Sequence, residues 1–500
     1  MSGRYKKRLN LLISVALALI LWQAGATLFG RYMGMGGFLV ATPVTVIKRL
    51  ASLLVSAGFW RRVWFSFYRI LAGFIAALIV GTLLAMAAGT HPVIETLLWP
   101  YVTVVKTTPV ASFIILCLLW VGSVNLSAVI SFLMVLPIVY ANLLEGIRST
   151  DKRLLEMADV FRVGWARRAL YIFIPHLKPY IASACAVALG TTWKAGIAAE
   201  VIGIPGGSIG EMLYEAKVYL SAADLFSWTV VIIIISVGFE KLFMALLRKA
   251  YAAVEAMGRV GPEDIVRDAG EGGEAYGLSS KGYAPVCDIT DLADTLAEDS
   301  PRRHGPDIII SDLYKSYGEK QVLTAFSAMI PGGGRVCVMG ESGSGKTTLF
   351  RVLMGLTKPD SGSVKGLAGV KLSAVFQENR LCDSLNAVAN VRFACGKAVS
   401  KPRIVAHLGE LGLGDSLNQP VRELSGGMKQ RVSIARAILA GGEALFLDEP
   451  FSGLDEANLA LTAGYISRRA NGKTVIMISH DKEEAELMGA EIITLPISSR

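Results

Sequence analysis

Long apolar runs separated by short polar loops fill the first half of the chain, and no run of comparable length follows residue 250. Six of the runs have about the length of a bilayer-spanning helix. They fall near residues 9–29, 68–90, 104–122, 126–147, 180–204 and 225–247. The pattern predicts an all-α polytopic membrane domain of six helices in a lipid bilayer, with both of its ends on one side.

The first run could be mistaken for a secretory signal peptide, because a cluster of basic residues precedes it. The cluster consists of Arg4, Lys6, Lys7 and Arg8. The run is long enough to cross a bilayer and shows no convincing small-residue cleavage site, which favours a first membrane helix.

Basic residues indicate the orientation, because the cytoplasmic loops of membrane proteins carry an excess of Lys and Arg. Six spans would place the following basic residues on the same side of the membrane as the N-terminal cluster: Arg148, Lys152, Arg153, Arg162, Arg167, Arg168, Lys178, Lys241, Arg248 and Lys249. One loop disagrees, and its basic residues are Lys48, Arg49, Arg61 and Arg62. The majority predicts a multi-pass protein of the cytoplasmic membrane with both termini in the cytoplasm.

The third and fifth predicted spans contain ionisable residues: Lys106, Lys194 and Glu200. Charges at membrane depth cost several kcal/mol unless they face a partner or a wet cavity. These three residues could line a solute path, or they could sit at span ends, where they would snorkel or pair between helices. The spacing leaves both interpretations open.

The loop at residues 150–178 is charged and too long for a simple hairpin. Leu154, Leu155, Ala158 and Phe161 recur at helical spacing, which predicts an amphipathic helix on the cytoplasmic side. Such a helix could lie in the membrane plane or dock a partner, and the spacing alone does not choose between the two.

Composition supports a division into unlike parts. The 500 residues are 53% hydrophobic and only 18% charged, which is too apolar for an ordinary soluble enzyme. The net charge of +9 comes without a basic stripe that has interleaved aromatic residues, so no nucleic-acid partner is expected. The six cysteines form no C-x-x-C pair, which favours reduced thiols.

Residues 259–305 are acidic and Gly-rich and predict a flexible linker, with a regulatory role as the alternative.

From residue 306 the chain alternates strands and helices, which predicts an α/β domain with a nucleotide at the strand ends. Between an apolar strand at 335–339 and a helix that starts near Thr348 lies a full G-x-x-x-x-G-K-[ST] phosphate-binding loop. Its residues are Gly340, Glu341, Ser342, Gly343, Ser344, Gly345, Lys346 and Thr347. We expect the backbone N–H groups to surround phosphate oxygens of ATP, Lys346 to reach the β- and γ-phosphates, and Thr347 to ligate Mg²⁺.

Polar residues that end further apolar strands complete this chemistry. Asp448 and Glu449 end the strand at 445–449; Asp448 would hold Mg²⁺ through water, and Glu449 would polarise the attacking water. Gln377 also ends a strand and can contact Mg²⁺ or the attacking water. His480 follows a buried strand in a position to bond the γ-phosphate.

A second phosphate-binding helix N-terminus is expected at Ser425, Gly426 and Gly427, which precede a helix at 432–439. Asp455 belongs to the Ser-Gly-Leu-Asp sequence that follows the paired carboxylates. Tyr317 lies upstream of the phosphate-binding loop, where it could stack on adenine or be a buried core residue.

These motifs together resemble one family. Residues 307–500 resemble the nucleotide-binding domain of ATP-binding-cassette (ABC) transporters, whose Walker A loop matches 340–347 and whose signature matches 424–427. The resemblance implies that Gln377 is the Q-loop glutamine, that Asp455 is in the D-loop, and that His480 is the switch histidine. Met428 departs from the family pattern, in which Gln is frequent. Because only residues 491–500 follow the switch region, we expect this cassette to lack the C-terminal extension of many importer cassettes.

Residues 1–250 resemble a type I importer permease of the nitrate/sulfonate/taurine group. Glu156-Met157-Ala158 and Ile174-Pro175 are similar to the EAA loop of such permeases, which implies docking onto the ATPase rather than a membrane anchor. Arg162 stands where that loop usually has glycine. Residues 193–203 are also similar to this permease group.

The resemblance implies a permease at 1–258 fused through the linker to an ABC ATP-binding domain at 306–500, which are separate chains in most relatives. It further implies ATP hydrolysis coupled to solute import, a homodimer with ATP between residues 340–347 of one copy and 425–427 of the other, and an extracytoplasmic solute-binding protein. A nitrate-, sulfonate- or taurine-type anion is the expected solute, with a vitamin precursor or other organic solute as the alternative. An ABC exporter is the alternative of a different class, although it would lack the EAA-like loop.

Overall fold

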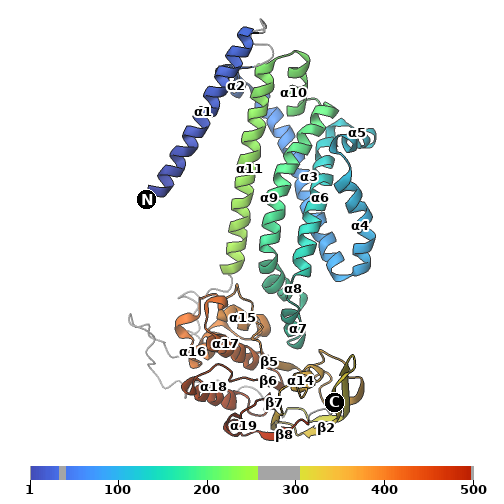
Figure 1. Ribbon diagram of the computed structural model, residues 1–500, viewed down its shortest axis with the longest axis vertical. Helices are drawn as coiled ribbons and strands as arrows, with labels where there is room; N and C mark the ends of the chain where they lie inside the picture. The colour runs from blue at the N-terminus through green and yellow to red at the C-terminus, as the bar shows by residue number, and fades with distance from the viewer. Residues whose placement is uncertain (1, 33–40, 257–304, 497–500) are drawn as a thin grey trace. The chain divides into compact units, whose positions relative to one another are not determined.

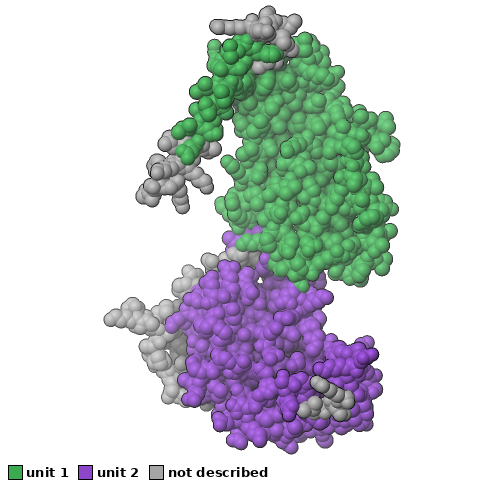
Figure 2. All heavy atoms as spheres, viewed as in Figure 1, with its two compact units in different colours: residues 1–150, 176–250 green, residues 151–175, 251–500 purple. Residues whose placement is uncertain are grey.

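The computed structural model describes residues 2–32, 41–256 and 305–496. The chain divides into two compact units, which Figure 2 colours separately. One contains Met1–Thr150 and His176–Ala250, and the other contains Asp151–Pro175 and Tyr251–Arg500. The predicted linker at 259–305 lies outside the described residues except for Gly305.

The first unit is built entirely from helices in its described part (Figure 1). They are α1 (Ser2–Tyr32), α2 (Pro43–Leu54), α3 (Ala57–Thr90), α4 (Pro92–Thr107), α5 (Val110–Val121), α6 (Ser123–Arg148), α9 (Ile174–Gly203), α10 (Ile209–Val218) and α11 (Ala222–Ala256). By length and composition, four helical segments could cross a membrane, and α4 with α5 could form a fifth as a bent pair. The apolar part of α1 is shorter, at Ile13–Phe29.

The predicted single span at residues 104–122 differs from the structure. The chain bends by 110° between α4 and α5, at Thr108 and Pro109. Proline has no backbone N–H and disfavours helical geometry in the residue before it, which explains why α4 ends there.

Close packing of α3 on α6 forms much of the helical core. Phe74 and Ala77 of α3 are fully buried in one cluster with Val135 and Val139 of α6. The backbones approach so closely that a Cβ atom on Gly73 would lie 2.2 Å from the carbonyl oxygen of Ala128. Only glycine fits this position without a shift of the helices.

Glu200, one of the ionisable residues in the third and fifth predicted spans, is fully buried. Its carboxylate accepts hydrogen bonds from the Ser66 hydroxyl at 2.6 Å and from the Gly210 N–H at 3.2 Å. The Ser66 hydroxyl in turn accepts a bond from the N–H of Ile209. Glu200 therefore ties α9 to α3 and to the first turn of α10, whereas Lys106 and Lys194 are exposed in the single chain.

The second unit has the predicted α/β fold. Its parallel sheet has the order β5-β6-β7-β3-β8, and a smaller antiparallel sheet has the order β2-β1-β4. The strands are β1 (Ile308–Tyr317), β2 (Lys320–Ile330), β3 (Arg335–Met339), β4 (Ser361–Lys365), β5 (Leu372–Val375), β6 (Ala444–Asp448), β7 (Thr474–Ile478) and β8 (Glu491–Thr494). The main helices are α14 (Lys346–Leu353), α15 (Ala387–Cys395), α16 (Lys401–Glu410), α17 (Gly426–Leu439), α18 (Glu456–Arg469) and α19 (Lys482–Leu487).

The segment at 151–175 belongs to this second unit. It forms α7 (Lys152–Val160), α8 (Trp165–Arg168) and a π-helical turn (Ala169–Phe173). Met157, Ala158 and Phe161 are buried in the same hydrophobic cluster as the strands of the sheet. The amphipathic helix predicted here is thus present, and its apolar face packs on the α/β domain.

Gly73→Ala should destabilise the helical unit by roughly 1–3 kcal/mol, because the added methyl group overpacks the α3–α6 contact. The matched control is Gly190→Ala within α9, where an added Cβ meets no atom within 4 Å. Thermal unfolding of the purified full chain in detergent should show a lower midpoint for Gly73→Ala only. An unchanged midpoint for this variant would contradict the close approach.

Stability of the second unit should fall as the pH drops from about 6.5 toward 4. Burial lowers the pKa of His407 to about 4, and its Nδ1 lies 2.8 Å from the Tyr465 hydroxyl. Because the unfolded chain takes up a proton at higher pH than the folded chain, stability is fully present above the ordinary His pKa and is lost below it. His407→Gln should flatten the dependence of the unfolding midpoint on pH, and the exposed His91→Gln should leave it unchanged.

Candidate functional site

The loop between β3 and α14 has the geometry that the phosphate-binding motif predicts. Gly343 and Gly345 adopt positive φ angles of 84° and 97°, which glycine accepts readily. A Cβ atom on Gly345 would lie 2.8 Å from the carbonyl oxygen of Val322. The loop leads into α14 at Lys346, so free backbone N–H groups and the positive end of the helix dipole gather at this point.

Side chains of the loop add further donors for an anion. Lys346 is largely buried, and its Nζ donates hydrogen bonds to the carbonyl oxygens of Gly340 at 2.8 Å and Glu341 at 2.9 Å. The ammonium is therefore held across the loop. The buried Ser344 hydroxyl has no hydrogen-bond partner among the described residues. Backbone donors, a cation and a free hydroxyl in one cradle fit the phosphate chain of a nucleotide.

The sheet brings the other predicted polar residues to the same edge as this loop. β5, β6, β7 and β3 are neighbours and parallel, so their carboxyl ends lie side by side. Gln377 follows β5, Asp448 ends β6, and His480 follows β7. Residues far apart in the sequence thus meet at the strand ends, where nucleotides bind in such folds.

Asp448 and Glu449 have different surroundings. Burial, and then the neighbouring Glu449 carboxylate, raises the pKa of Asp448 to about 6. Glu449 has a positive φ of 47°, which is unusual for a residue with a side chain. Its N–H donates to the Ile478 carbonyl at 3.0 Å, and Gln430 donates to its carbonyl oxygen at 3.2 Å. These bonds hold the strained backbone in place.

Two of the predicted catalytic residues are in direct contact. The Nε2 atom of His480 lies 3.3 Å from a carboxylate oxygen of Glu449. Both side chains are partly exposed, so solvent and a ligand can reach them. Gln430, which sequence reasoning did not single out, also donates to the carbonyl of Pro450 and so fixes the turn after Glu449.

Ser425 begins α17 as predicted, since its hydroxyl accepts a hydrogen bond from the N–H of Met428. Gly427 packs beside the turn before Asp455: a Cβ atom there would lie 3.1 Å from Leu454. Asp455 begins α18, and its carboxylate accepts a hydrogen bond from the N–H of Asn458, which lowers its pKa. In the described part of the single chain, no hydrogen bond or ion pair joins Ser425, Gly426 or Gly427 to residues 340–347.

Tyr317 is 50% exposed at the end of β1, so it is not the buried core residue that was the alternative. The nearby ammonium of Lys315 lies 5.5 Å from the centre of its ring. The exposure of the ring is compatible with stacking on adenine, which stays a prediction.

An ion-pair cluster joins the 151–175 segment to the α/β domain. Two N–H groups of Arg351 donate to the two Glu156 oxygens at 2.7 and 3.0 Å, and Arg380 donates at 3.0 Å. The first of these partners, Arg351, lowers the pKa of Glu156 most. The Arg380 guanidinium also lies over the Phe376 ring at 3.9 Å. Hereafter we call Glu156, Arg351 and Arg380 the docking cluster.

Further contacts extend the docking cluster along the segment. Arg167 donates to the carbonyl oxygens of Phe393 at 2.9 Å and Ala394 at 3.1 Å, and Arg153 pairs with Glu378. Arg162 adopts a positive φ of 50°, which explains why glycine is usual at this turn in similar loops. The 151–175 segment therefore docks on the α/β domain. The alternative, a helix that lies in the membrane plane, does not agree with these contacts.

Comparisons with known proteins agree with both halves. Residues 323–452 match the family model described as ABC transporter, and residues 73–251 match the one described as binding-protein-dependent transport system inner membrane component. An aliphatic sulfonates import ATP-binding protein from Pseudomonas putida is 35% identical over 214 residues, which cover 40% of this chain and 77% of that protein.

Two further relatives and a solved structure match the second half. An ergothioneine transport ATP-binding protein from Helicobacter pylori is 34% identical over 38% of this chain and 96% of its own length. An aliphatic sulfonates import ATP-binding protein from Rhizobium johnstonii is 36% identical over 38% of this chain and 73% of its own length. A solved dimeric bacterial ABC transporter cassette is 28% identical over 38% of this chain and 94% of its own, with a TM-score of 0.35.

The chain belongs to the ABC transporter family. It is a membrane protein that joins the permease and the ATPase of an importer in one polypeptide. It binds and hydrolyses ATP and couples this reaction to import, and the exporter alternative is not favoured.

Proposed function

We propose that this fused permease and ATPase imports a small sulfonate-type anion across the cytoplasmic membrane. The observation that carries the proposal is the combination, in one chain, of an importer permease with a cassette similar to import ATPases named for aliphatic sulfonates. A relative named for ergothioneine transport keeps an organic solute of another kind as the second candidate.

Within the cassette, the residues at the strand ends have different proposed roles in the binding and hydrolysis of ATP. The 340–347 loop and Lys346 hold the phosphates. The oxygen donors of Thr347, Gln377 and Asp448 would hold Mg²⁺, because a hydroxyl, an amide and a carboxylate are suitable ligands for a hard cation. When bound, Mg²⁺ supplies positive charge that offsets the charge of the phosphate oxygens.

Glu449 then orients and polarises the attacking water, and His480 contacts the γ-phosphate. The 3.3 Å contact between these two side chains supports this assignment, because it keeps them at one point of the site. Thr348 follows the loop in the first turn of α14, and Tyr317 provides a surface for the adenine ring.

Two copies of the chain complete each nucleotide site. The helix start at Ser425, Gly426 and Gly427 has backbone N–H groups that suit a phosphate, but within the described residues no hydrogen bond or ion pair joins it to the 340–347 loop. A homodimer would place this start opposite the loop of the partner, with Asp455 beside it. An external solute-binding protein would deliver the solute, and the basic loops support cytoplasmic cassettes and termini.

The docking cluster provides a route from ATP to the permease. Arg351 lies one helical turn after Thr347 on α14, and Arg380 follows Gln377 by three residues. Both guanidinium groups bind the same Glu156 carboxylate. A change at the phosphate or at Gln377 therefore acts on the segment that continues directly into α9.

Glu449→Gln should abolish ATP turnover while ATP still binds, because an amide cannot polarise water as a carboxylate does. In cells that express the chain with its solute-binding protein, uptake of labelled alkanesulfonates should also stop. The control is Glu456→Gln, an exposed carboxylate in the first turn of α18. Normal hydrolysis by Glu449→Gln would refute the assignment, and a wild-type chain that takes up no sulfonate in the presence of ATP would refute the proposed solute.

Glu156→Gln should lower the amount of solute imported per ATP by about tenfold or more, because Arg351 and the largely buried Arg380 lose their shared counter-charge. Loss of a charge-assisted hydrogen bond costs about 1.5–3 kcal/mol. Glu378→Gln is the matched control, since its pair with Arg153 is exposed and contributes at most about 1 kcal/mol. Uptake and ATP hydrolysis are measured on the same membranes. An unchanged ratio in Glu156→Gln would rule out transmission through the docking cluster.

A further inference from the structure

The short helix α2 has three faces, each formed by residues that lie three or four positions apart in the sequence. The inner face packs on the helical unit and consists of Pro43, Val46, Leu50 and Leu53. The second face, which we call the outer apolar face, is exposed and consists of Val44, Ile47, Ala51 and Leu54. The third face is polar and exposed and consists of Thr45, Lys48, Arg49 and Ser52.

Two contacts with α11 fix the rotation of α2 about its own axis. Arg49 forms an ion pair with Asp224 in the first turn of α11. The Ser227 hydroxyl donates a hydrogen bond to the carbonyl oxygen of Val46 at 3.3 Å. Because the inner face is held in this way, Ile47 stays 64% exposed on the surface of the single chain.

The start of α3 has the side chains that mark the surface of a bilayer. Trp60, Trp64 and Tyr68 are four residues apart, so they share one side of α3, and each is more than half exposed. Trp and Tyr are enriched where a membrane meets water. The Trp60 Nε1 group donates to the carbonyl oxygen of Leu54 at 3.1 Å, which joins the end of α2 to this level of the membrane.

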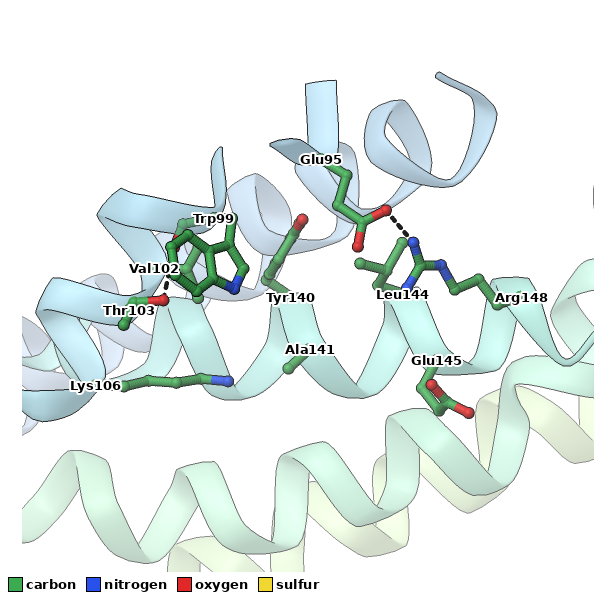
Figure 3. Close-up of a pocket in the computed structure, with 10 residues that line it drawn as sticks. All are labelled: Glu95, Trp99, Val102, Thr103, Lys106, Tyr140, Ala141, Leu144, Glu145 and Arg148. Carbon is green, nitrogen blue, oxygen red and sulfur yellow. Dashed lines mark hydrogen bonds and ion pairs between the residues drawn. The ribbon is translucent and has the colours of Figure 1, made fainter. Parts of the chain in front are cut away.

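Exposed basic residues occur in the same region. No Asp or Glu lies between residues 41 and 94. Lys48 and Arg61 are exposed and form no ion pair or side-chain hydrogen bond within the part of the chain that the structure describes. Elsewhere in the helical unit, Arg148 is paired with Glu95 in a pocket lined by α4 and α6 (Figure 3). A partner with an apolar layer and negative charge at its surface therefore fits α2 and the start of α3.

We infer that α2 lies in the headgroup layer of the bilayer, with its outer apolar face against acyl chains and with Lys48 and Arg61 bound to the phosphates of anionic phospholipids. A helix with a basic polar face and a separate apolar face lies in this layer, with its apolar side about 5–10 Å deep. The outer apolar face is continuous with the lipid-facing surface of α3 through the contact of Leu54 with Trp60.

The inference also gives a role to the loop whose basic residues disagree with the predicted orientation. Lipid phosphates attract Lys and Arg side chains near a membrane surface, so these cations need no cytoplasmic location. A water-soluble protein docked here would have to cover Ile47 and Leu54 at the level that Trp60 and Trp64 mark as the bilayer surface.

Nitroxide labels on two faces of α2 test its position. The described cysteines are buried, and Cys287→Ser removes the sixth. On this background, Ile47→Cys on the outer apolar face and Ser52→Cys on the polar face are labelled in the full chain in nanodiscs. EPR then measures collisions of each label with oxygen, which concentrates in lipid, and with a water-soluble nickel chelate.

The Ile47 label should collide several-fold more often with oxygen than the Ser52 label, and the Ser52 label should collide several-fold more often with the chelate. Equal, high collision with the chelate at both positions would place α2 in water, as a surface for a soluble protein, and would overturn the inference. Protection of the Ile47 label from both reagents would place it against protein, such as a second copy, and would overturn it as well.

A fluorescent bimane on Ser52→Cys, one helical turn from Lys48, tests the lipid phosphates. The nanodiscs consist of phosphatidylcholine with an equal small fraction of nitroxide-labelled phosphatidylglycerol or nitroxide-labelled phosphatidylcholine. Each basic residue near a membrane surface favours anionic lipid by about fivefold. Labelled phosphatidylglycerol should therefore quench the bimane several-fold more strongly than labelled phosphatidylcholine does.

Lys48→Gln combined with Arg61→Gln should remove this difference in quenching. The control is Lys365→Gln, an exposed lysine at the end of β4, which should keep the full difference. Equal quenching by the two labelled lipids when both cations are present, or an unchanged difference in the double variant, would overturn the binding of lipid phosphates by α2 and α3.

Discussion

The docking cluster is the interaction on which the functional organisation of this chain depends. One carboxylate, Glu156, receives two parallel N–H bonds from Arg351 and a further bond from Arg380. Bidentate pairs of this kind fix direction as well as distance. Because Arg351 belongs to the helix that follows the phosphate-binding loop and Arg380 follows Gln377 by three residues, the carboxylate contacts groups from two parts of the candidate nucleotide site.

Because the docking cluster is partly buried, we expect a movement of one of its residues to move the others. Arg380 is held against Phe376 and is mostly buried, so it cannot readily exchange Glu156 for water. Leaving a buried charge without its partner costs more than the pair contributes, so any movement of Arg380 should draw Glu156 with it. The apolar side of the segment, with Met157 and Phe161, follows because it is part of the same core.

Sequence alone was sufficient where the determinants are local. The phosphate-binding loop, the helix start at Ser425 and the apolar strand before Asp448 each depend on a few consecutive residues. Sequence alone was not sufficient to identify Arg351 and Arg380 as partners of Glu156, because they follow it by 195 and 224 residues in the chain. The resemblance to a docking loop pointed to Glu156 but not to its partners. Only the α/β packing brings these side chains together.

The sequence also did not predict the local backbone geometry at positions where the residue type is atypical for that geometry. Arg162 adopts the positive φ that glycine would supply, and the hydrogen bond from the Val163 N–H to the Ala158 carbonyl holds the turn. The bend at Pro109 was hidden because the predicted span at 104–122 is apolar on average, although Lys106, Thr107 and Thr108 directly precede the proline. A hydropathy pattern reports burial or lipid contact, but it does not report direction.

The ionisable residues of the helical unit show how a charge in apolar surroundings can be read. Glu200 is fully buried, and Ser66 and the first turn of α10 donate to one oxygen of its carboxylate, whereas the other oxygen has no hydrogen-bond partner among the described residues. Lys106 and Lys194 are instead exposed in the single chain. Because a buried charge is costly unless a partner or water satisfies it, the donors on Ser66 and α10 are needed at Glu200, whereas the two exposed lysines need none from the single chain.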